Sequence, residues 1–239
     1  MDKELVWPED LTTKGDDNRR QALQRFDISP LIHLALLPGQ KLTNYLNRTI
    51  TTHYYQFQFT EKSSGRRGGF YCGDSAAEGS PATPKSNKQE GWLKLAGLQR
   101  LRCINPLAIP YMCPTKNGVT GEPSVPKNEH ERIVAALQLV SVTAISVWNM
   151  GNKGSILAMI YRDLCFKQLY ENQLLSKIKS VNTIIAGMKH LNEGESFQLY
   201  LERLQGKHPE WRFRHFNSEL LKTQLLTHPG ITPESRIIF

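Results

Sequence analysis

Cysteine is the residue type here that could most directly do chemistry, because paired thiolates hold structural zinc. The chain has 4 cysteines, and Phe70–Gly73 reads F-Y-C-G, the pattern of one half of a zinc knuckle. The second ligand would stand three residues after Cys72, where the chain has Ser75. Cys103 and Cys113 are ten residues apart, which is not a knuckle pair.

Other side chains would therefore have to complete a zinc site. The candidates are His53, His130 and Cys165, and none of them stands at knuckle spacing from another ligand. The uneven cysteine spacing also does not indicate a disulfide framework. We expect reduced, inert thiols and no tightly bound structural zinc.

Basic side chains form a second group, and they are concentrated in one part of the chain. Lys+Arg number 30 and Asp+Glu 22, a net charge of +8. Residues 41–127 hold 12 basic and 5 acidic residues (+7), residues 1–40 hold 5 and 7 (−2), and residues 128–239 hold 13 and 10 (+3). A clustered basic surface most often binds nucleic acid, less often an anionic membrane, and the plainer alternative is a solvated face. The candidate nucleic-acid-binding residues are Arg66, Arg67, Lys85, Lys88, Lys94, Arg100 and Arg102.

Aromatic residues accompany the basic ones in two places. Tyr54 and Tyr55 could stack on exposed bases, although the alternation around them favours an ordinary half-buried strand. Trp211–Phe216 alternates aromatic and basic residues and could contact a nucleic-acid backbone or a partner subunit. More often such a segment is an edge element packed on the core.

Motifs for catalysis are weak. The chain has no G-x-x-x-x-G-K-[ST], H-E-x-x-H or G-x-S-x-G sequence. Glu129-His130-Glu131 lacks a second histidine four residues later. Asp74, with Glu90 and Lys94, lacks the tight acid-x-Lys spacing of many metal-dependent nucleases. We therefore expect no enzyme, no catalytic residues and no metal ligands.

The elements that must position these residues differ between the two halves. Residues 1–27 suggest an arm or short helix, Leu31–Leu37 a short apolar helix ended by Pro38-Gly39, and Gln40–Arg48 another short helix. Ile50–Thr60 alternates like a strand, and Phe70–Cys72 would return as the second strand of a hairpin. Asp74–Glu90 and Thr115–Asn128 suggest flexible loops.

The second half is predicted to be helical. Glu129–Leu191 indicates two long helices joined by Gly151–Gly154, with a break near Ser180–Asn182, and shorter helices follow at Glu195–Gln205 and Ser218–Leu226. Asn128 or Lys127 opens the first of these helices, and with Asn128 as the N-cap, Glu131 would complete a capping box. Residues 133–152 carry no charge, but Gln138 and several Ser, Thr and Asn side chains weaken a transmembrane interpretation.

We expect an α+β fold, mainly α, with a small N-terminal antiparallel hairpin region with long loops and a helical C-terminal half. The expected division is a basic region with flexible loops at residues 1–127 and a helical domain at residues 128–239. The start, MDKELVWPEDL, is acidic and lacks the apolar core of a signal peptide, so we expect a cytoplasmic protein without a membrane span.

The order of these features resembles one family. An apolar segment ending in Pro38-Gly39, then Phe70–Gly73, then Cys113-Pro114 and a helical second half are similar to the large-subunit protein of plasmid-borne type IV CRISPR effector complexes. The resemblance covers about residues 29–114. It implies a non-catalytic subunit in antiviral defence that contacts the guide RNA 5′ end, neighbouring subunits and a short duplex motif next to the target. Family members usually carry paired zinc-binding cysteines, and this chain lacks a complete set.

The leading hypothesis is therefore a nucleic-acid-binding subunit of a CRISPR-type guide-RNA ribonucleoprotein, with guide RNA, target duplex DNA and other subunits as partners. Base pairing would then supply most of the sequence specificity. The first alternative is a stand-alone DNA-binding regulator of a mobile element, which half-site symmetry and dimerisation would favour. The second is a metal-dependent nuclease. Metal-dependent cleavage that is abolished by removing one acidic residue would favour it.

Overall fold

The computed structural model describes residues 7–8, 15–81, 89–114, 121–148, 151–232 and 235–239, with the backbone alone for residues 151–154. The chain forms two compact units. The first comprises Met1–Asn105 with Asn149–Ser155, and the second comprises Pro106–Trp148 with Ile156–Phe239. A sheet lies in the first unit and long helices make up the second, which confirms the α+β class with a helical C-terminal half. The N-terminal segment of the first unit ends at Asn105, whereas the sequence suggested a division at residue 127.

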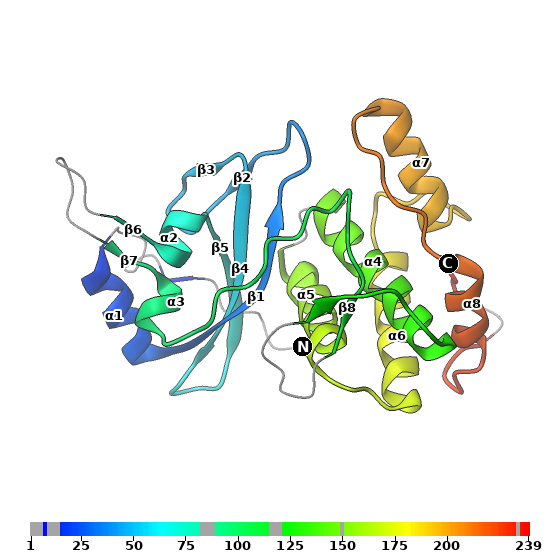
Figure 1. The fold of residues 1–239 in the computed structure, drawn as a ribbon, viewed down its shortest axis with the longest axis horizontal. Helices are drawn as coiled ribbons and strands as arrows, with labels where there is room; N and C mark the ends of the chain where they lie inside the picture. The colour runs from blue at the N-terminus through cyan, green and yellow to red at the C-terminus, as the bar shows by residue number, and fades with distance from the viewer. Residues whose placement is uncertain (1–6, 9–14, 82–88, 115–120, 149–150, 233–234) are drawn as a thin grey trace. The chain divides into compact units, whose positions relative to one another are not determined.

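The first unit is built on a three-stranded antiparallel sheet in the order β1-β4-β5. Its strands are β1 (Phe26–Ala35), β4 (His53–Glu61) and β5 (Arg67–Cys72), so the predicted hairpin is confirmed. The helices α1 (Asp16–Arg25), α2 (Asp74–Glu78) and α3 (Trp92–Leu95) lie on one side of these strands (Figure 1). Two short pairs complete the unit: β2 (Leu42–Thr43) with β3 (Thr49–Ile50), and β6 (Gly79–Ser80) with β7 (Gln89–Glu90).

An aromatic core fills the space between the sheet and these helices. Phe57 and Phe70 pair across β4 and β5, and their rings stack at 5.2 Å. Trp92 from α3 lies 5.5 Å from Phe70, and the rings of Trp7 and Phe59 also meet there. Antiparallel partners on one face bring these rings together, and each buried ring contributes a large apolar area. The core therefore fixes the register of the sheet.

Three sequence-based predictions in this unit were wrong. Of Leu31–Leu37, expected to be helical, Leu31–Ala35 belong to strand β1, and within Gln40–Arg48 the strand β2 covers Leu42–Thr43. Asp74–Glu90, expected to be a loop, begins with α2 and includes β6 and β7. Most of β1 is buried on both faces, and a continuous apolar run does not distinguish a strand from a short helix. The register shift between Pro30 and Ile32 accommodates the proline.

The second unit contains five helices longer than eight residues in its described part and one short strand pair. The helices are α4 (Glu129–Trp148), α5 (Gly151–Phe166), α6 (Glu171–Ala186), α7 (Phe197–Lys207) and α8 (Ser218–Leu226). The strands β8 (Met112–Cys113) and β9 (Glu122–Pro123) precede them. The predicted pair of long helices is thus three helices. The helical path breaks after Phe166 rather than near Ser180, and Gly151–Gly154 lie within α5.

Helix α4 begins as the sequence predicts. Asn128 Oδ1 accepts a hydrogen bond from the Glu131 backbone N–H at 2.9 Å. The Glu131 carboxylate in turn accepts from the Lys127 N–H at 2.7 Å, one residue before the expected partner. By length and composition α4 could cross a membrane, but 67% of its most apolar window is buried inside the protein. This burial is typical of a core helix in a soluble domain.

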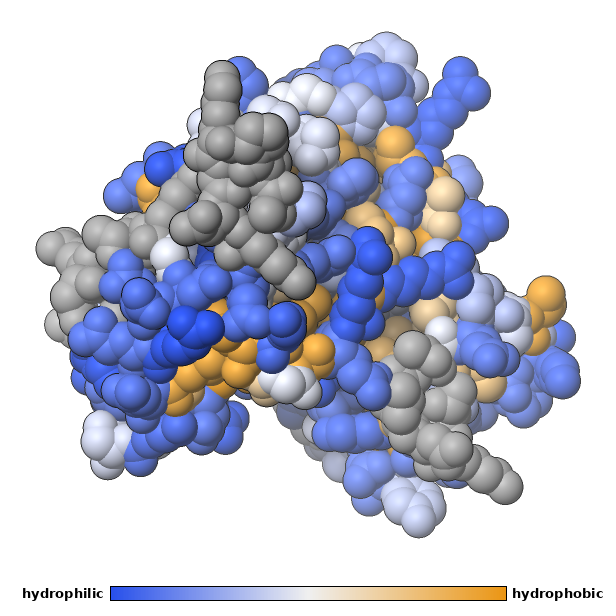
Figure 2. Space-filling model, turned by 60° about the vertical axis from the view of Figure 1, so that its left-hand side comes forward, coloured by the Kyte–Doolittle hydropathy of each residue, from blue (hydrophilic) through white to orange (hydrophobic). Residues whose placement is uncertain are grey.

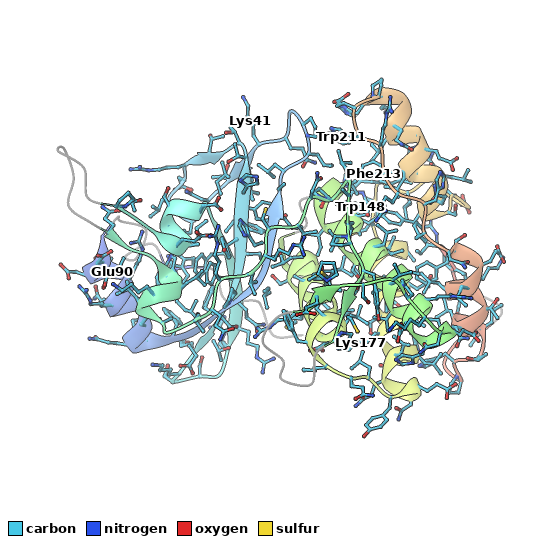
Figure 3. The ribbon with its side chains drawn as sticks, in the orientation of Figure 1. Lys41, Glu90, Trp148, Lys177, Trp211 and Phe213 are labelled. Carbon is cyan, nitrogen blue, oxygen red and sulfur yellow. The ribbon has the colours of Figure 1, made fainter. Side chains whose placement is uncertain are left out.

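The segment between α7 and α8 packs on the core without forming a strand. Trp211 and Phe213 are both 7% exposed, whereas Arg212 and Arg214 lie at the surface. Arg214 Nη1 donates to the Ile109 carbonyl at 2.7 Å. On the face that Figure 2 shows, hydrophilic residues dominate and hydrophobic atoms are visible in patches between them. Figure 3 labels Trp211, Phe213 and Trp148, which come from the second unit.

Candidate functional site

A group of polar side chains lies at one end of the sheet in the first unit. The sheet register places His33 of β1 opposite Tyr55 of β4, and Tyr55 opposite Cys72 of β5. Residues paired in this way share one face of a sheet. Asp74 and Glu78 of α2 and Arg100 complete the group. We call His33, Tyr55, Asp74, Glu78 and Arg100 the polar cluster.

The short helix α2 places the two carboxylates of the polar cluster. It follows β5 directly after Gly73, whose carbonyl accepts hydrogen bonds from the Ala76 and Ala77 N–H groups. Asp74 and Glu78 are four residues apart, so they lie on the same face of this turn. The backbone of Gly91 fits closely against α2, because a Cβ atom at Gly91 would overlap the Ala77 carbonyl oxygen and the Gly79 nitrogen. This fit holds α2 against the start of α3.

His33 is 2% exposed, and both of its ring nitrogens face oxygen atoms. Nδ1 lies 3.2 Å from the Leu101 carbonyl oxygen, and Nε2 lies 2.9 Å from Asp74 Oδ1. Its ring stacks on Tyr55 at 3.9 Å between centroids. A neutral imidazole offers one donor and one acceptor, so it can satisfy only one of two acceptor oxygens. With the proton on Nε2, that N–H donates to Asp74; with the proton on Nδ1, the Nε2 lone pair and Asp74 Oδ1 face each other and could share a cation.

Glu78 accepts two hydrogen bonds on one oxygen. The Tyr55 hydroxyl donates to Oε1 at 2.8 Å, and Arg100 Nε lies 2.8 Å from the same atom. Burial, and then the Glu78 carboxylate, raise the pKa of Tyr55, so this phenol stays protonated. The negative charge of Glu78 also raises the pKa of Arg100. The cluster is therefore a network of fixed charges and donors.

Two further side chains flank the polar cluster. His53 Nδ1 lies 3.5 Å from Asp74 Oδ2, and the His53 side chain is 47% exposed. Cys103 is exposed, yet desolvation and the Asp74 charge raise the pKa of its thiol. A raised pKa leaves Cys103 as a thiol near neutral pH, in which form it is a poor metal ligand. Imidazole and carboxylate groups are thus the metal-binding groups here.

The predicted nucleic-acid-binding residues do not form one patch. Arg67 pairs with Thr60 at one end of the β4–β5 hairpin, and Tyr55 of the cluster lies at the other, roughly 17 Å away at about 3.4 Å per residue. Arg66 adjoins Arg67 in the turn and is exposed. Lys85 and Lys88 lie outside the described residues.

The remaining three predicted residues lie near the carboxylates of this unit. Arg100 pairs with Glu78, and Lys94 pairs with Glu90. Arg102 is exposed, two residues along from Arg100. The structure therefore brings Arg100 to the polar cluster and leaves Arg67 and Arg102 as exposed cations at separate places.

The four cysteines are all free thiols. Cys72 is fully buried, and burial raises its pKa. Burial also raises the pKa of Cys165 to about 12. Cys72 belongs to the first unit and Cys113 to the second. Cys72 and Cys165 are thus buried thiols, whereas Cys113 is half-buried and Cys103 is exposed.

The second unit contains a pocket of about 680 Å³ beside the start of α4. Tyr111, Glu129, His130 and Lys167 are among its lining residues. Its Glu131 carboxylate already accepts the Lys127 N–H, so this group caps the helix. The polar cluster is the stronger candidate site, because its groups converge on a buried histidine.

Sequence reasoning missed His33, Asp74 and Glu78 as a group. Forty-one residues separate His33 from Asp74, and no spacing motif links them. One signal was present in the chain: an isolated histidine in an otherwise apolar run, Leu31–Ala35. A buried polar side chain in such a run requires a partner from elsewhere in the fold.

The comparisons with known proteins give one finding. No curated protein and no solved structure matches the chain. The model of a family described as uncharacterised conserved protein UCP028583 matches residues 11–235. Since the match covers most of the 239 residues, this chain belongs to that family.

Proposed function

We propose that this chain is a non-catalytic, cytoplasmic nucleic-acid-binding subunit of a ribonucleoprotein. The observation that carries the proposal is a set of exposed cations on the first unit. Arg67 and Arg102 are exposed and form no ion pair within the described part of the chain. Cations without carboxylate partners are available to phosphates.

The β2–β3 region adds further positive charge. Lys41 and Arg48 are exposed there, and Lys41 extends from the protein at this end of the first unit (Figure 3). Loops and turns can present such side chains without disturbing the core. Cations at several separate turns suit an extended backbone better than a small ligand.

The resemblance to type IV CRISPR large subunits gives the proposal its specific form. The partners would be a guide RNA, the target duplex DNA and the other subunits of the complex. The protein would read a short duplex motif, and guide pairing would read the target sequence.

Salt-dependent binding tests the proposal. Fluorescence anisotropy would follow labelled single-stranded RNA, single-stranded DNA and duplex DNA at several salt concentrations. Arg67→Ala/Arg102→Ala should weaken binding and lower the slope of log K against log salt for duplex DNA by about two, because each phosphate contact contributes roughly 0.9. The matched control is Lys207→Ala, an exposed cation at the end of α7. If the double variant and the Lys207→Ala control bind with the same affinity and the same salt slope, the proposal is contradicted.

A second candidate is a metal-dependent nuclease, which the convergence of His33, Asp74 and Glu78 favours. Such a nuclease would cleave labelled RNA or DNA only with a divalent cation, and Asp74→Asn would abolish cleavage. Binding of nucleic acid without cleavage in the presence of Mg²⁺, Mn²⁺ or Zn²⁺ would exclude the nuclease and favour the non-catalytic role.

A further inference from the structure

Three side chains of the polar cluster offer metal ligands at close range. One ligand atom each from His33, Asp74 and Glu78 lies within 4.8 Å of the others. Metal–ligand bonds of about 2.0–2.2 Å hold the ligand atoms of a tetrahedral ion roughly 3.4 Å apart. Small side-chain adjustments would bring the three atoms to that separation. We propose that His33, Asp74 and Glu78 bind one divalent transition-metal ion, independently of the proposed nucleic-acid binding.

The environment of His33 is the first argument for an ion. Its Nδ1 lies 3.2 Å from the Leu101 carbonyl oxygen, and in the tautomer that carries the proton on Nδ1 this N–H donates to that oxygen. The Nε2 lone pair then points at Asp74 Oδ1, 2.9 Å away. A histidine that donates one N–H to a backbone carbonyl and binds metal through the other nitrogen is the usual arrangement in metal sites. A bound ion would remove the electrostatic repulsion between the Nε2 lone pair and the Asp74 carboxylate.

The carboxylates provide the second argument. The hydrogen bonds from Tyr55 and Arg100 both reach Glu78 Oε1, and in the described part of the chain Oε2 has no hydrogen-bond partner. These two donors orient the Glu78 carboxylate while Oε2 can bind the ion. Asp74 Oδ2 faces His53 at 3.5 Å, so His53 lies where a side-chain rotation could supply a fourth ligand.

The ligand set indicates which ions fit. One imidazole with two carboxylates suits Zn²⁺ or Mn²⁺, whereas Mg²⁺ and Ca²⁺ prefer oxygen ligands alone. The site also differs from a cysteine zinc finger, because none of the three ligands is a thiolate. The competing interpretation is a hydrogen-bond network without a metal ion, in which the His33 Nε2–H donates to Asp74.

Metal analysis of the full-length protein distinguishes the two interpretations. Protein stripped of metal with EDTA would be titrated with ZnCl₂ and with MnCl₂. Calorimetry would measure the titration, and elemental analysis after dialysis would measure the metal that stays bound. We expect one ion per chain for the wild type. Asp74→Asn and Glu78→Gln, which keep side-chain size, should each weaken binding by about tenfold or more. Glu195→Gln is the matched control, because Glu195 pairs with Arg203 in the second unit.

Two further measurements guard against misfolded variants and misplaced ions. Circular dichroism of the metal-free variants should match the wild type, and the wild type loaded with Co²⁺ should show the absorption of a site with imidazole and oxygen ligands and no thiolate charge-transfer band. A wild type that binds no ion, or Asp74→Asn and Glu78→Gln variants that bind as the wild type does, would overturn the proposal. Loss of binding in Cys113→Ser, or a thiolate band, would equally overturn it.

Discussion

Gln138 is a buried polar residue with a structural role in the helical unit. Its Oε1 accepts from the Met112 N–H at 3.0 Å, and its Nε2 donates to the carbonyls of Met112 at 2.8 Å and Leu164 at 3.2 Å. One amide side chain thus satisfies both backbone groups of Met112. The sequence indicated only that Gln138 interrupts an apolar run, and the structure supplies its partners.

Replacing Gln138 with leucine should destabilise the protein by about 2–4 kcal/mol. The change keeps the apolar volume but leaves the Met112 N–H and carbonyl without partners, and each unsatisfied buried group costs about 1–3 kcal/mol. Urea unfolding monitored by circular dichroism would measure the loss. Gln168→Leu is the control, because Gln168 is exposed. If the Gln138→Leu and Gln168→Leu variants have similar free energies of unfolding, Gln138 does not have the structural role assigned to it.

The candidate site shows why side-chain chemistry was hard to predict at this scale. The sequence identified Asp74 and His53 separately, each within an incomplete motif. Sheet pairing joins His33 to Tyr55, and the turn into α2 adds Asp74 and Glu78. Both contacts depend on the register of β1 against β4, which includes a shift at Pro30. Local spacing carries no information on such a register.

At the scale of elements, periodicity succeeded where polar and apolar residues alternate or where the element is long. The β4–β5 hairpin and helices α4, α7 and α8 were predicted close to their observed positions. Strand β1 was not predicted because its apolar residues are continuous. The break between α5 and α6 was not predicted because no Pro or Gly stands at residues 167–170. At the start of α6, Gln173 Oε1 instead accepts a hydrogen bond from the Tyr170 backbone N–H at 3.0 Å.

Helix α4 is central to the second unit, so a charge within it should unfold that unit. Val140 has no exposed surface, and Val140→Asp would bury a carboxylate without a partner, at a cost of several kcal/mol. We expect Val140→Asp to lose cooperative unfolding near room temperature, measured by thermal denaturation. Ala135→Asp, at a half-buried position of the same helix, should cost less. A Val140→Asp variant that melts like the wild type would contradict this arrangement.

Helices α5 and α6 are joined by a carboxylate between two lysines. Burial alone would raise the pKa of Asp163, but Lys167 and Lys177, each with Nζ at 2.6 Å, hold it below its usual value. A lowered pKa in the folded state adds stability that is present above the unfolded-state value of about 4 and is lost as the pH falls through the folded-state value.

Asp163→Asn should therefore reduce stability by about 1 kcal/mol at pH 7, discounted for the exposed Lys167 side chain. The difference from the wild type should shrink as the pH falls below about 4 and vanish once the pH has passed the lowered folded-state pKa of Asp163, where both proteins carry an uncharged group. Unfolding experiments between pH 2.5 and pH 7, at fixed ionic strength, would measure it. A difference that stays constant over this range would show that the ion pairs contribute nothing.

At the scale of the whole molecule, composition predicted the class and the charge asymmetry but not the division of the chain. The prolines at 106, 110 and 114 and the loop-like sequence after them suggested an extension of the basic region. Instead the described residues 106–114 and 121–127 group with the helices, because Gln138 and Arg214 hold the backbone at Met112 and Ile109. Long-range hydrogen bonds of this kind leave no local pattern in a sequence.

The net charge of +8 leads to the last prediction, that the protein carries nucleic acid from the cell. Purified below about 0.1 M salt, where the Debye length is about 10 Å or more, it should show a raised ratio of absorbance at 260 to 280 nm. A wash at about 1 M salt, where the Debye length is about 3 Å, should remove this excess. RNase and DNase digestion of separate samples would identify the bound nucleic acid, and mass spectrometry would identify proteins that elute with it. A low-salt preparation with the absorbance ratio of protein alone, and no accompanying subunit, would count against a ribonucleoprotein and leave the positive charge as a solvated surface.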